Sequence, residues 1–276
     1  MTVEVSVDGR TVVVNAGQSV LDACRAAGAA PPTLCYLDGF VPAGACRLCV
    51  VEVEGERRLA ASCARPAQDG MVVCTDSARV QRSRRLVLEL LAGSTDVTRG
   101  PELMAELERA GADPGRFGAV PVAAAVAAPP RLDNDLYVRD MARCVLCYRC
   151  VQACGDEAQH TYAIAVAGRG FDAKVACESD VDLTNSACVY CGNCVGVCPT
   201  GALIGRREFD MRAAGEWDES RQHQTDTICG YCGVGCTVTL HTQDNRIVKV
   251  TSPFDHEVAH GQLCIKGRFG WQFIEE

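Results

Sequence analysis

The sequence is poor in aromatic residues and has no segment typical of an export signal or a membrane span. Phe, Trp and Tyr make up 5% of the 276 residues. Residues 1–6 alternate polar and apolar side chains and lack the basic region, the apolar region and the twin arginine of export signals. The longest apolar run, residues 119–128, contains Pro121 and is too short to cross a bilayer. We therefore expect a cytoplasmic protein with no membrane insertion.

A surplus of basic residues is also missing. The formal net charge is −8 at pH 7 and the pI is about 5.2, whereas proteins that bind nucleic acid concentrate Lys and Arg on one face. We therefore expect no nucleic acid among the partners. The acidity indicates nothing further about function.

Cysteine, in contrast, is abundant and regularly spaced. The chain has 19 cysteines, an odd number that does not suit a closed disulfide framework, and cytoplasmic thiols stay reduced. Sixteen of them form four sets, Cys35/Cys46/Cys49/Cys63, Cys144/Cys147/Cys150/Cys154, Cys188/Cys191/Cys194/Cys198 and Cys229/Cys232/Cys236/Cys264. Because four thiolates are the usual ligands of one iron–sulfur cluster, the spacing predicts four clusters in one chain.

The two middle sets share the motif C-x2-C-x2-C-x3-C, and the second is followed by proline. In two-cluster ferredoxins the first three cysteines of such a run bind one [4Fe–4S] cluster, and the fourth binds the other cluster. We assign one cluster to Cys144, Cys147, Cys150 and Cys198. We assign the second to Cys188, Cys191, Cys194 and Cys154. Closed zinc sites favour two separated C-x2-C pairs instead.

The N-terminal set is spaced C-x10-C-x2-C-x13-C. Its long glycine-containing loop would let backbone N–H groups approach a bound anionic cluster closely. The spacing differs from that of plant-type ferredoxins, but the arrangement of strands and loop is the same. We expect a [2Fe–2S] cluster bound by Cys35, Cys46, Cys49 and Cys63. A zinc site or four unrelated thiols is the alternative.

The last set is spaced C-x2-C-x3-C-x27-C, from Cys229, Cys232 and Cys236 to Cys264. The glycines between its first three cysteines permit tight reversal of the chain around a cluster. Two separated parts of one site are also typical of a zinc ribbon. The spacing alone therefore leaves a structural zinc and a cluster open.

Three cysteines and five histidines lie outside these sets. Cys24 falls on the apolar face of a predicted helix and Cys74 on an apolar strand, so we expect both to be buried structural thiols. Cys177 receives no role. The histidines do not lie at ligand spacing from the spare cysteines, and we expect them to be structural or solvated: His160, His223, His241, His256 and His260.

The hydrophobic patterns predict an α+β, multi-domain protein that begins with a β-grasp domain at residues 1–78. Its predicted elements are a hairpin of 3–7 and 10–14 about Asp8-Gly9, a helix at 19–27, a hairpin of 50–53 and 57–60, and a strand at 71–74. Residues 79–130 are predicted to be a helical connector, broken at Gly93 and continued by a helix at 101–110, and then an Ala- and Pro-rich linker.

The second half of the chain is predicted to hold two further domains. Residues 131–207 contain the two middle sets as a near-repeat, separated by a possible hairpin of 162–166 and 171–175. Residues 208–226 are polar and charged, and we interpret them as a linker. Residues 227–276 contain the last set and a pair of strands, 237–240 and 247–250, that turns at Asp244-Asn245.

The order of these motifs resembles the N-terminal portion of the catalytic (alpha) subunit of NAD-dependent molybdenum or tungsten formate dehydrogenases, relatives of the large iron–sulfur subunit of respiratory complex I. The resemblance covers nearly all 276 residues. Residues 190–194 (YCGNC) and 198–203 (CPTGAL) look like the family's domain with two [4Fe–4S] clusters. Residues 229–236 (CGYCGVGC) and 264–269 (CIKGRF) look like the start of its bis-pterin molybdopterin oxidoreductase [4Fe–4S] domain.

The resemblance implies that Cys229, Cys232, Cys236 and Cys264 bind a [4Fe–4S] cluster, so that the chain holds one [2Fe–2S] and three [4Fe–4S] clusters. It also implies that Lys266 is a cofactor-binding residue between this cluster and a pterin, and an electron-relay candidate; a surface lysine is the alternative. Many members of the family that the chain resembles carry an additional cubane cluster with His and Cys ligands between the first and second cluster domains. Residues 79–130 contain neither residue type, so we do not expect that cluster here.

The resemblance implies the iron–sulfur electron-transfer chain of a formate dehydrogenase. It would carry electrons between a metal–pterin centre and a flavin/NAD-binding, diaphorase-type partner subunit. No catalytic residue is expected in this chain, because the Mo- or W-bis-pterin would lie on missing domains or on a partner chain. The chain is then part of an oxidoreductase but not catalytically complete. The alternatives are an electron-transfer subunit of a complex I-like NADH dehydrogenase or NAD-linked hydrogenase, and a zinc-bound assembly scaffold.

Overall fold

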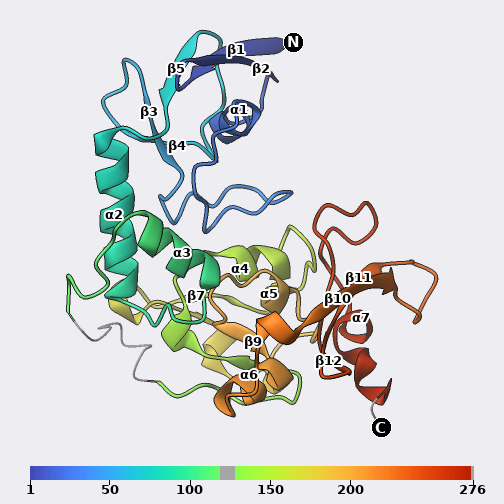
Figure 1. The fold of residues 1–276 in the computed structure, drawn as a ribbon. Helices are drawn as coiled ribbons and strands as arrows, with labels where there is room; N and C mark the ends of the chain where they lie inside the picture. Colours follow the sequence, from blue (N-terminus) through green and yellow to red (C-terminus); the bar gives the residue numbers. More distant parts are fainter. Residues whose placement is uncertain (119–127, 275–276) are drawn as a thin grey trace. The chain divides into compact units, whose positions relative to one another are not determined.

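The structure, a computed structural model, describes residues 1–118 and 128–274 (Figure 1). The chain divides into two compact units, residues 1–122 and 123–276. The apolar run at 119–128 and part of the predicted linker lie outside the described residues, apart from the run's last alanine. No helix in the described part of the chain is long and apolar enough to cross a membrane.

The first unit contains a five-stranded sheet with the strand order β2-β1-β5-β3-β4. Strands β1 (Thr2–Val7) and β2 (Arg10–Asn15) form the predicted hairpin, and both turn residues, Asp8 and Gly9, have the positive φ that a type I′ turn requires. Strand β5 (Met71–Cys74) pairs in parallel with β1 and antiparallel with β3 (Val50–Val53). Strand β4 (Ala60–Ala61) pairs with β3, and is shorter and nearer the C-terminus than predicted.

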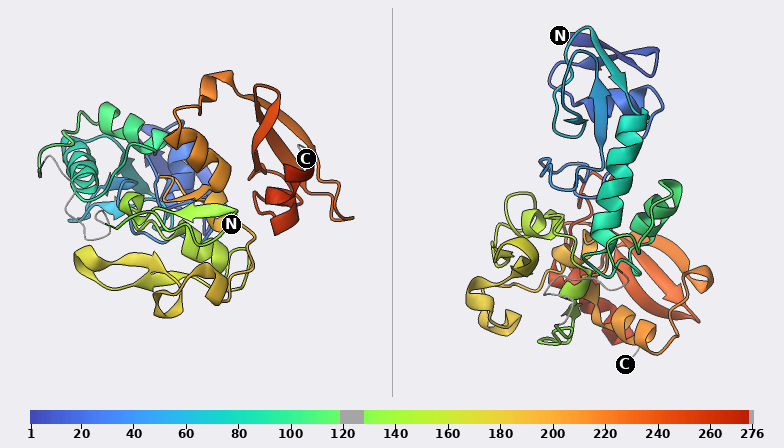
Figure 2. Two further views of the ribbon diagram at one scale, coloured as in Figure 1. Left: turned by 90° about the horizontal axis from the view of Figure 1, so that it is seen from below. Right: turned by 90° about the vertical axis from the view of Figure 1, so that its left-hand side faces the viewer.

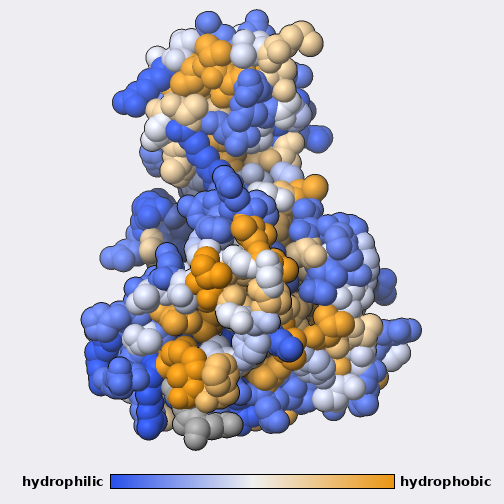
Figure 3. Space-filling view, turned by 90° about the vertical axis from the view of Figure 1, so that its right-hand side faces the viewer, coloured by the Kyte–Doolittle hydropathy of each residue, from blue (hydrophilic) through white to orange (hydrophobic). Residues whose placement is uncertain are grey.

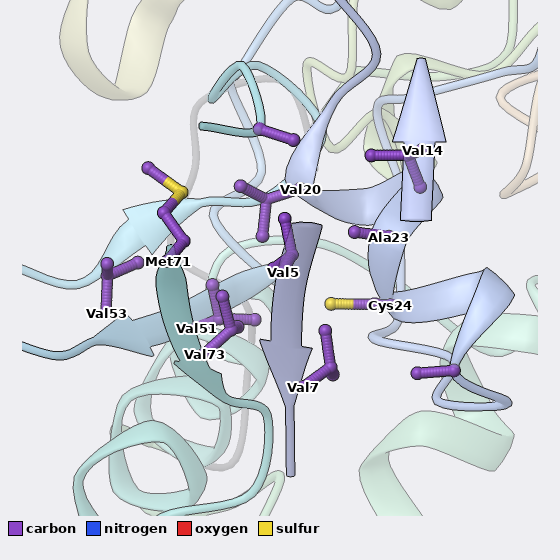
Figure 4. Close-up of a cluster of buried hydrophobic side chains, with 12 residues drawn as sticks. Val5, Val7, Val14, Val20, Ala23, Cys24, Val51, Val53, Met71 and Val73 are labelled. Atoms are coloured by element: carbon purple, nitrogen blue, oxygen red, sulfur yellow. The ribbon is translucent and has the colours of Figure 1, made fainter. Parts of the chain in front are cut away.

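Helix α1 (Val20–Ala26) covers this sheet and closes the core. It begins at Ser19, whose side chain and that of Asp22 form a capping box. Val20, Ala23 and Cys24 point toward the valines of β1, β3 and β5 in one apolar cluster (Figure 4). This sheet and helix form the ferredoxin-like β-grasp layout that the sequence predicted.

Two further helices complete the first unit. Helix α2 (Ala78–Ala92) is capped by the Ser77 side chain and ends at Gly93, as predicted. Helix α3 (Pro101–Arg109) has proline in its first turn and packs against α2. Helix α2 also contacts β3, and this contact places its side chains beside the first cysteine loop.

The second unit begins with two short ladders around the middle cysteine sets. Strand β6 (Tyr137–Arg139) pairs antiparallel with β9 (Leu203–Gly205), so the segments before the first run and after the second lie side by side. Helices α4 (Arg149–Cys154) and α5 (Asn193–Gly196) begin inside the two runs, two residues after the second cysteine of each. Strands β7 (Ala165–Ala167) and β8 (Lys174–Ala176) form the expected hairpin a few residues later than predicted.

A three-stranded antiparallel sheet carries the last cysteine set: β10 (His223–Ile228), β11 (Thr237–Gln243) and β12 (Arg246–Thr251). Its second turn falls at Asp244 and Asn245, as predicted, and both have positive φ. Helix α7 (Ile265–Phe269) packs against β12 (Figure 2). Short 3-10 turns connect the elements of this unit: Met141–Arg143, Gly170–Asp172, Glu178–Asp180, Leu183–Asn185, Glu219–Arg221 and Gly270–Ile274.

The segment interpreted as a linker, 208–226, is mostly structured. It contains most of helix α6 (Arg206–Ala213) and the start of β10. Ion pairs at i,i+4, Arg206 with Asp210 and Glu208 with Arg212, lie along α6. Such pairs stabilise a helix that lacks a broad apolar face, and a purely hydrophobic pattern does not reveal it.

Candidate metal centres

The first cysteine set gathers at one end of the first unit. Cys35, Cys46 and Cys49 lie on the loop between α1 and β3, and Cys63 lies two residues after the end of β4. The backbone N–H of Cys46 donates to Cys35 Sγ at 3.4 Å, and the sulfurs of Cys49 and Cys63 are 3.3 Å apart. In the loop, Gly44 and Arg47 both have positive φ and turn the chain back toward its own sulfurs. The structure therefore arranges the four predicted ligands as two close pairs, Cys35 with Cys46 and Cys49 with Cys63.

These thiols are electrostatically unequal. A hydrogen bond from Cys35 lowers the pKa of Cys46 to about 5, and a hydrogen bond from Cys63 lowers that of Cys49 to about 6. The same hydrogen bonds, together with burial, raise the pKa values of Cys35 and Cys63. Each pair thus favours one thiolate at neutral pH, and thiolate is the form that binds metal.

Arg84 of α2 donates hydrogen bonds to the backbone of the first cysteine loop, a role that the sequence did not reveal. Its Nε donates to the Leu48 carbonyl at 3.0 Å, and its Nη2 donates to the Val50 carbonyl at 2.8 Å. The Ser62 hydroxyl donates to the Cys49 carbonyl at 2.7 Å. The backbone on both sides of Cys49 is therefore fixed, and a positive charge lies close to a site that would hold an anionic cluster.

The two middle sets surround two separate cavities in the second unit. One cavity is lined by Cys144, Cys147, Cys150 and Cys198. The other is lined by Cys154, Cys188, Cys191 and Cys194. The fourth cysteine of each run thus lies with the first three cysteines of the other run. This is the exchanged grouping expected from the motif of two-cluster ferredoxins.

The two runs have the same backbone geometry. In each, the residues directly before and after the second cysteine are left-handed: Leu146 and Tyr148 in the first, and Tyr190 and Gly192 in the second. A helix begins immediately afterwards. A backbone N–H also reaches each fourth sulfur, from Ala163 to Cys154 at 3.3 Å and from Leu203 to Cys198 at 3.4 Å.

The cavities disfavour bare thiolates. Burial raises the pKa of Cys144 to about 11 and that of Cys147 to about 12. It also raises the pKa values of Cys150 and Cys194 well above their usual range. Burial therefore favours neutral thiols, and four thiolates around either cavity would need a cationic centre for charge compensation; the donor set fits an iron–sulfur core.

Tyr137 is a functional candidate that the sequence analysis missed. It is 1% exposed, and its hydroxyl lies 3.1 Å from Cys188 Sγ. Burial raises its pKa, so the phenol stays protonated and can donate. Its ring stacks on that of Phe269, with centroids 6.1 Å apart and an interplanar angle of 16°.

The last set lies in a more exposed environment. Cys229 and Cys236 pack against the cluster of Val238, Leu263 and Trp271, whereas Cys232 and Cys264 are exposed. Helix α7 begins directly after Cys264, and a Cβ built on Gly267 would lie 3.8 Å from Cys229 Sγ. The return segment thus comes close to the first cysteine of the set.

Lys266 lies over the Tyr231 ring, with Nζ 5.8 Å from the centroid. Apolar side chains are exposed around this part of the chain, and Figure 3 shows hydrophobic patches on the face turned to the viewer. The large exposed apolar residues from 227 onward are Ile228, Tyr231, Val234, Val258, Ile265, Phe273 and Ile274.

A polar contact inside the second unit joins the third and fourth sets. The Asn193 side-chain oxygen accepts from the Leu263 N–H at 2.8 Å and from Arg268 Nη2 at 3.2 Å. Arg268 is 4% exposed, and burial lowers its pKa to about 10 although Cys194 and Cys191 act in the opposite direction. A Cβ added at Gly192 would lie 2.5 Å from Arg268 Cδ. Glycine at 192 therefore permits the close approach of α7.

The residues outside the sets behave mostly as expected. Cys24 is buried, which raises its pKa to about 12, and Cys177 is buried beside Arg139. The prediction for Cys74 is wrong, because the alternation of β5 buries Met71 and Val73 and exposes Val72 and Cys74. Among residues 1–118 and 128–274, no three His, Cys, Asp or Glu side chains converge as they would on a single metal ion.

The described histidines have ordinary partners or solvent. His241 Nε2 lies 2.8 Å from the Thr251 hydroxyl, and His256 Nε2 lies 2.8 Å from the Thr237 hydroxyl. His160, His223 and His260 are exposed. These contacts agree with structural or solvated histidines.

Family models match three parts of the chain. Residues 1–78 match a 2Fe-2S iron-sulfur cluster binding domain. Residues 135–204 match the ferredoxin-like domain of NADH-quinone oxidoreductase subunit 3. Residues 222–276 match a molybdopterin oxidoreductase Fe4S4 domain. Each cysteine set lies in a matched region, and the predicted α+β, multi-domain fold class is confirmed.

Individual relatives extend this similarity over nearly the whole chain. It is 34% identical to the mitochondrial 78 kDa subunit of NADH-ubiquinone oxidoreductase of Candida albicans, over 97% of this chain and 36% of that protein. It is 26% identical to a putative formate dehydrogenase of Staphylococcus haemolyticus, over 98% of this chain and 31% of that protein. The chain thus spans about a third of the length of these curated relatives.

A solved structure is also similar. A chain of an NAD+-reducing [NiFe]-hydrogenase in the H2-reduced state matches with a TM-score of 0.64 and 30% identity. The match covers 74% of the present chain and 87% of the hydrogenase chain.

Proposed function

The chain belongs to the family of iron–sulfur subunits that join these three domains, and we propose from this premise that it carries electrons through four clusters. Domains that bind 2Fe-2S and 4Fe-4S clusters are present. Bound clusters supply one-electron redox chemistry, and the chain contributes ligands, burial and charge. The observation that carries the proposal is the pair of cavities, each lined by three cysteines of one run and the fourth of the other.

We propose the ligands that the sequence predicted. A [2Fe–2S] cluster would be held by Cys35, Cys46, Cys49 and Cys63. Two [4Fe–4S] clusters would be held by Cys144, Cys147, Cys150 and Cys198, and by Cys188, Cys191, Cys194 and Cys154. A third would be held by Cys229, Cys232, Cys236 and Cys264.

Anaerobic reconstitution with iron and sulfide tests this proposal. It should yield about 14 iron atoms per chain, visible iron–sulfur absorption, and EPR signals of both cluster types after reduction. Zinc reconstitution is the matched control, because structural zinc would occupy the same thiolates. Four tightly bound zinc ions with no visible iron–sulfur absorption after iron treatment would overturn the proposal.

For the parent complex, we propose an NAD-linked formate dehydrogenase. Electrons would be exchanged between a metal–pterin centre on domains outside residues 1–276 and a flavin/NAD partner subunit. The match to a molybdopterin oxidoreductase Fe4S4 domain supports the first of these partners. Lys266 lies at the solvent-facing fourth site, where its charge would offset that of an anionic cluster and pterin. The exposed apolar residues around that site favour coverage by further polypeptide.

A second candidate is an electron-transfer subunit of a complex I-like NADH dehydrogenase or an NAD-linked hydrogenase. The relatives named for NADH-ubiquinone oxidoreductase and for the hydrogenase are more similar than the one named for formate dehydrogenase. Purification of the chain from its native host with its partners would separate the candidates. Formate-dependent dye reduction together with bound Mo or W supports the first. NADH- or H2-dependent reduction without Mo or W supports the second.

A further inference from the structure

The two proposed [4Fe–4S] sites of the second unit differ in the side chains around their sulfurs. Apart from its cysteines, the first cavity is lined by Met141, Val145, Tyr148, Val175, Thr200, Ala202 and Leu203, and the Thr200 hydroxyl lies 3.9 Å from Cys198 Sγ. The second is also lined largely by apolar side chains, but its lining includes Arg139, Gln159, Thr161 and Tyr137, whose hydroxyl lies only 3.1 Å from Cys188 Sγ. The same ligand motif therefore lies in two different electrostatic environments.

Tyr137 is held firmly in the second environment. Its strand, β6, pairs with β9, and its backbone N–H donates to Asn134 Oδ1 at 3.0 Å. The ring stacks on Phe269 and tilts against Tyr190, with centroid distances of 6.1 and 6.4 Å. The Tyr137 side chain is 1% exposed, and its hydroxyl lies 3.1 Å from Cys188 Sγ. Because the backbone and the ring are both held, the hydroxyl cannot readily turn to another partner.

Cys188 and Cys144 are the equivalent first cysteines of the two runs. Cys188 lies within reach of the Tyr137 hydroxyl and also accepts from the Tyr190 N–H at 3.4 Å. Cys144 interacts instead with backbone N–H groups at Leu146 and Val175. A hydrogen bond to a ligating thiolate stabilises the reduced cluster, which carries more negative charge, and so raises the reduction potential.

We propose that the Tyr137 hydroxyl donates a hydrogen bond to the Cys188 thiolate and makes the cluster of Cys154, Cys188, Cys191 and Cys194 the higher-potential member of the pair. The inference rests on the proposed function, because it requires both clusters. In a chain that has taken up one electron at this pair, the electron would then reside mainly on the cluster beside Tyr137.

An EPR-monitored redox titration of the reconstituted full chain tests this inference. The wild type should show two separable steps for the pair. Tyr137→Phe keeps the ring and its stacking and removes only the hydroxyl, so the higher step should move to lower potential while the other remains in place. Tyr190→Phe is the matched control, since it removes a neighbouring hydroxyl and retains the backbone N–H donated to Cys188. It should move neither step.

The outcomes separate the inference from the proposed function. Two wild-type steps that Tyr137→Phe leaves unmoved would overturn the inference alone. Absence of the paired-cluster signals from the wild type would overturn the function as well. If Tyr137→Phe does not fold, biosynthetic labelling of the wild-type chain with 3-fluorotyrosine preserves the shape and strengthens the donor. The higher step should then rise, and an unmoved step would overturn the inference.

Discussion

The two halves of the paired-cluster region have the same ligand spacing and backbone turns but different surroundings. Both runs place left-handed residues on either side of the second cysteine and then begin a helix. In the second run the Cys188 sulfur lies 3.1 Å from the Tyr137 hydroxyl, and Gly192 packs closely against Arg268 of α7; in the first run Cys144 interacts with backbone N–H groups. The repeated motif thus determines where the ligands lie, whereas single residues outside the motif, such as Tyr137, determine the environment of each site.

The largest expected effect comes from removing the fourth cysteine of either run. Cys198→Ala should remove about four of about 14 iron atoms, and the lost cluster should be that of the first run although Cys198 lies in the second. Cys154→Ala should remove the other cluster, including the redox step that responds to Tyr137. Iron analysis and redox titration of both variants check this. If Cys198→Ala removed the Tyr137-sensitive step instead, the exchanged grouping would be wrong.

The next effect concerns the buried ion pair beside the second cavity. Arg139 and Asp133 are paired at 3% and 5% side-chain exposure. Asp133→Asn leaves a buried guanidinium without its counter-charge, so the free energy of unfolding should fall by about 3 kcal/mol. Denaturant titration, monitored by the loss of cluster absorption, measures this change in the free energy of unfolding. Asp210→Asn, which breaks the exposed pair with Arg206, is the control and should change stability by less than about 1 kcal/mol.

The Arg139–Asp133 ion pair should also make the stability of the fold depend on pH, and the pKa of Asp133 determines the direction. Burial opposes ionisation of Asp133, but hydrogen bonds from the Leu183 N–H and from Arg139 outweigh it and hold the pKa of Asp133 below its usual range. A carboxyl with a depressed folded-state pKa stabilises the fold above the unfolded value and loses that contribution as pH falls. The difference in stability between wild type and Asp133→Asn should therefore shrink below about pH 4. A difference that grew toward acid pH would contradict this assignment.

The smallest expected effect compares the equivalent residues Tyr148 and Gly192, both left-handed. Tyr148→Gly relieves an unfavourable φ at a partly exposed position and should change stability by no more than about 1 kcal/mol. Gly192→Ala adds a Cβ 2.5 Å from Arg268 Cδ and 2.6 Å from Phe269 Cε2, so it should destabilise the second unit by about 2 kcal/mol. Denaturant midpoints of both variants, measured with clusters bound, test whether the two halves tolerate change equally.

Local signals in the sequence predicted much of the fold. The residue pairs Asp8-Gly9 and Asp244-Asn245 predicted two hairpin turns because few other pairs accept positive φ twice in succession. The period-two alternation of β5 indicates that Cys74 is exposed, whereas the apolar residues around Cys74 favour a buried position. Helix α6 was missed because its evidence lies in charge pairs four residues apart and not in an apolar face.

The ligand sets were predictable because cysteines recur at short spacing, but the residues that tune the sites were not. Tyr137 meets Cys188 across 51 positions, and Arg268 meets Asn193 across 75. Neither residue belongs to a periodic pattern, and each is an ordinary core or helix residue when considered alone. Such contacts exist only after β6 has paired with β9 and α7 has packed against α5.

The Asn193 amide couples the third cysteine set to the fourth. Asn193 directly precedes Cys194, and its acceptor oxygen binds the N–H of Leu263, which directly precedes Cys264. The loop that returns the final ligand is therefore anchored to a helix whose own position depends on Cys194. Cluster binding at Cys194 would therefore help to order the segment that carries Cys264.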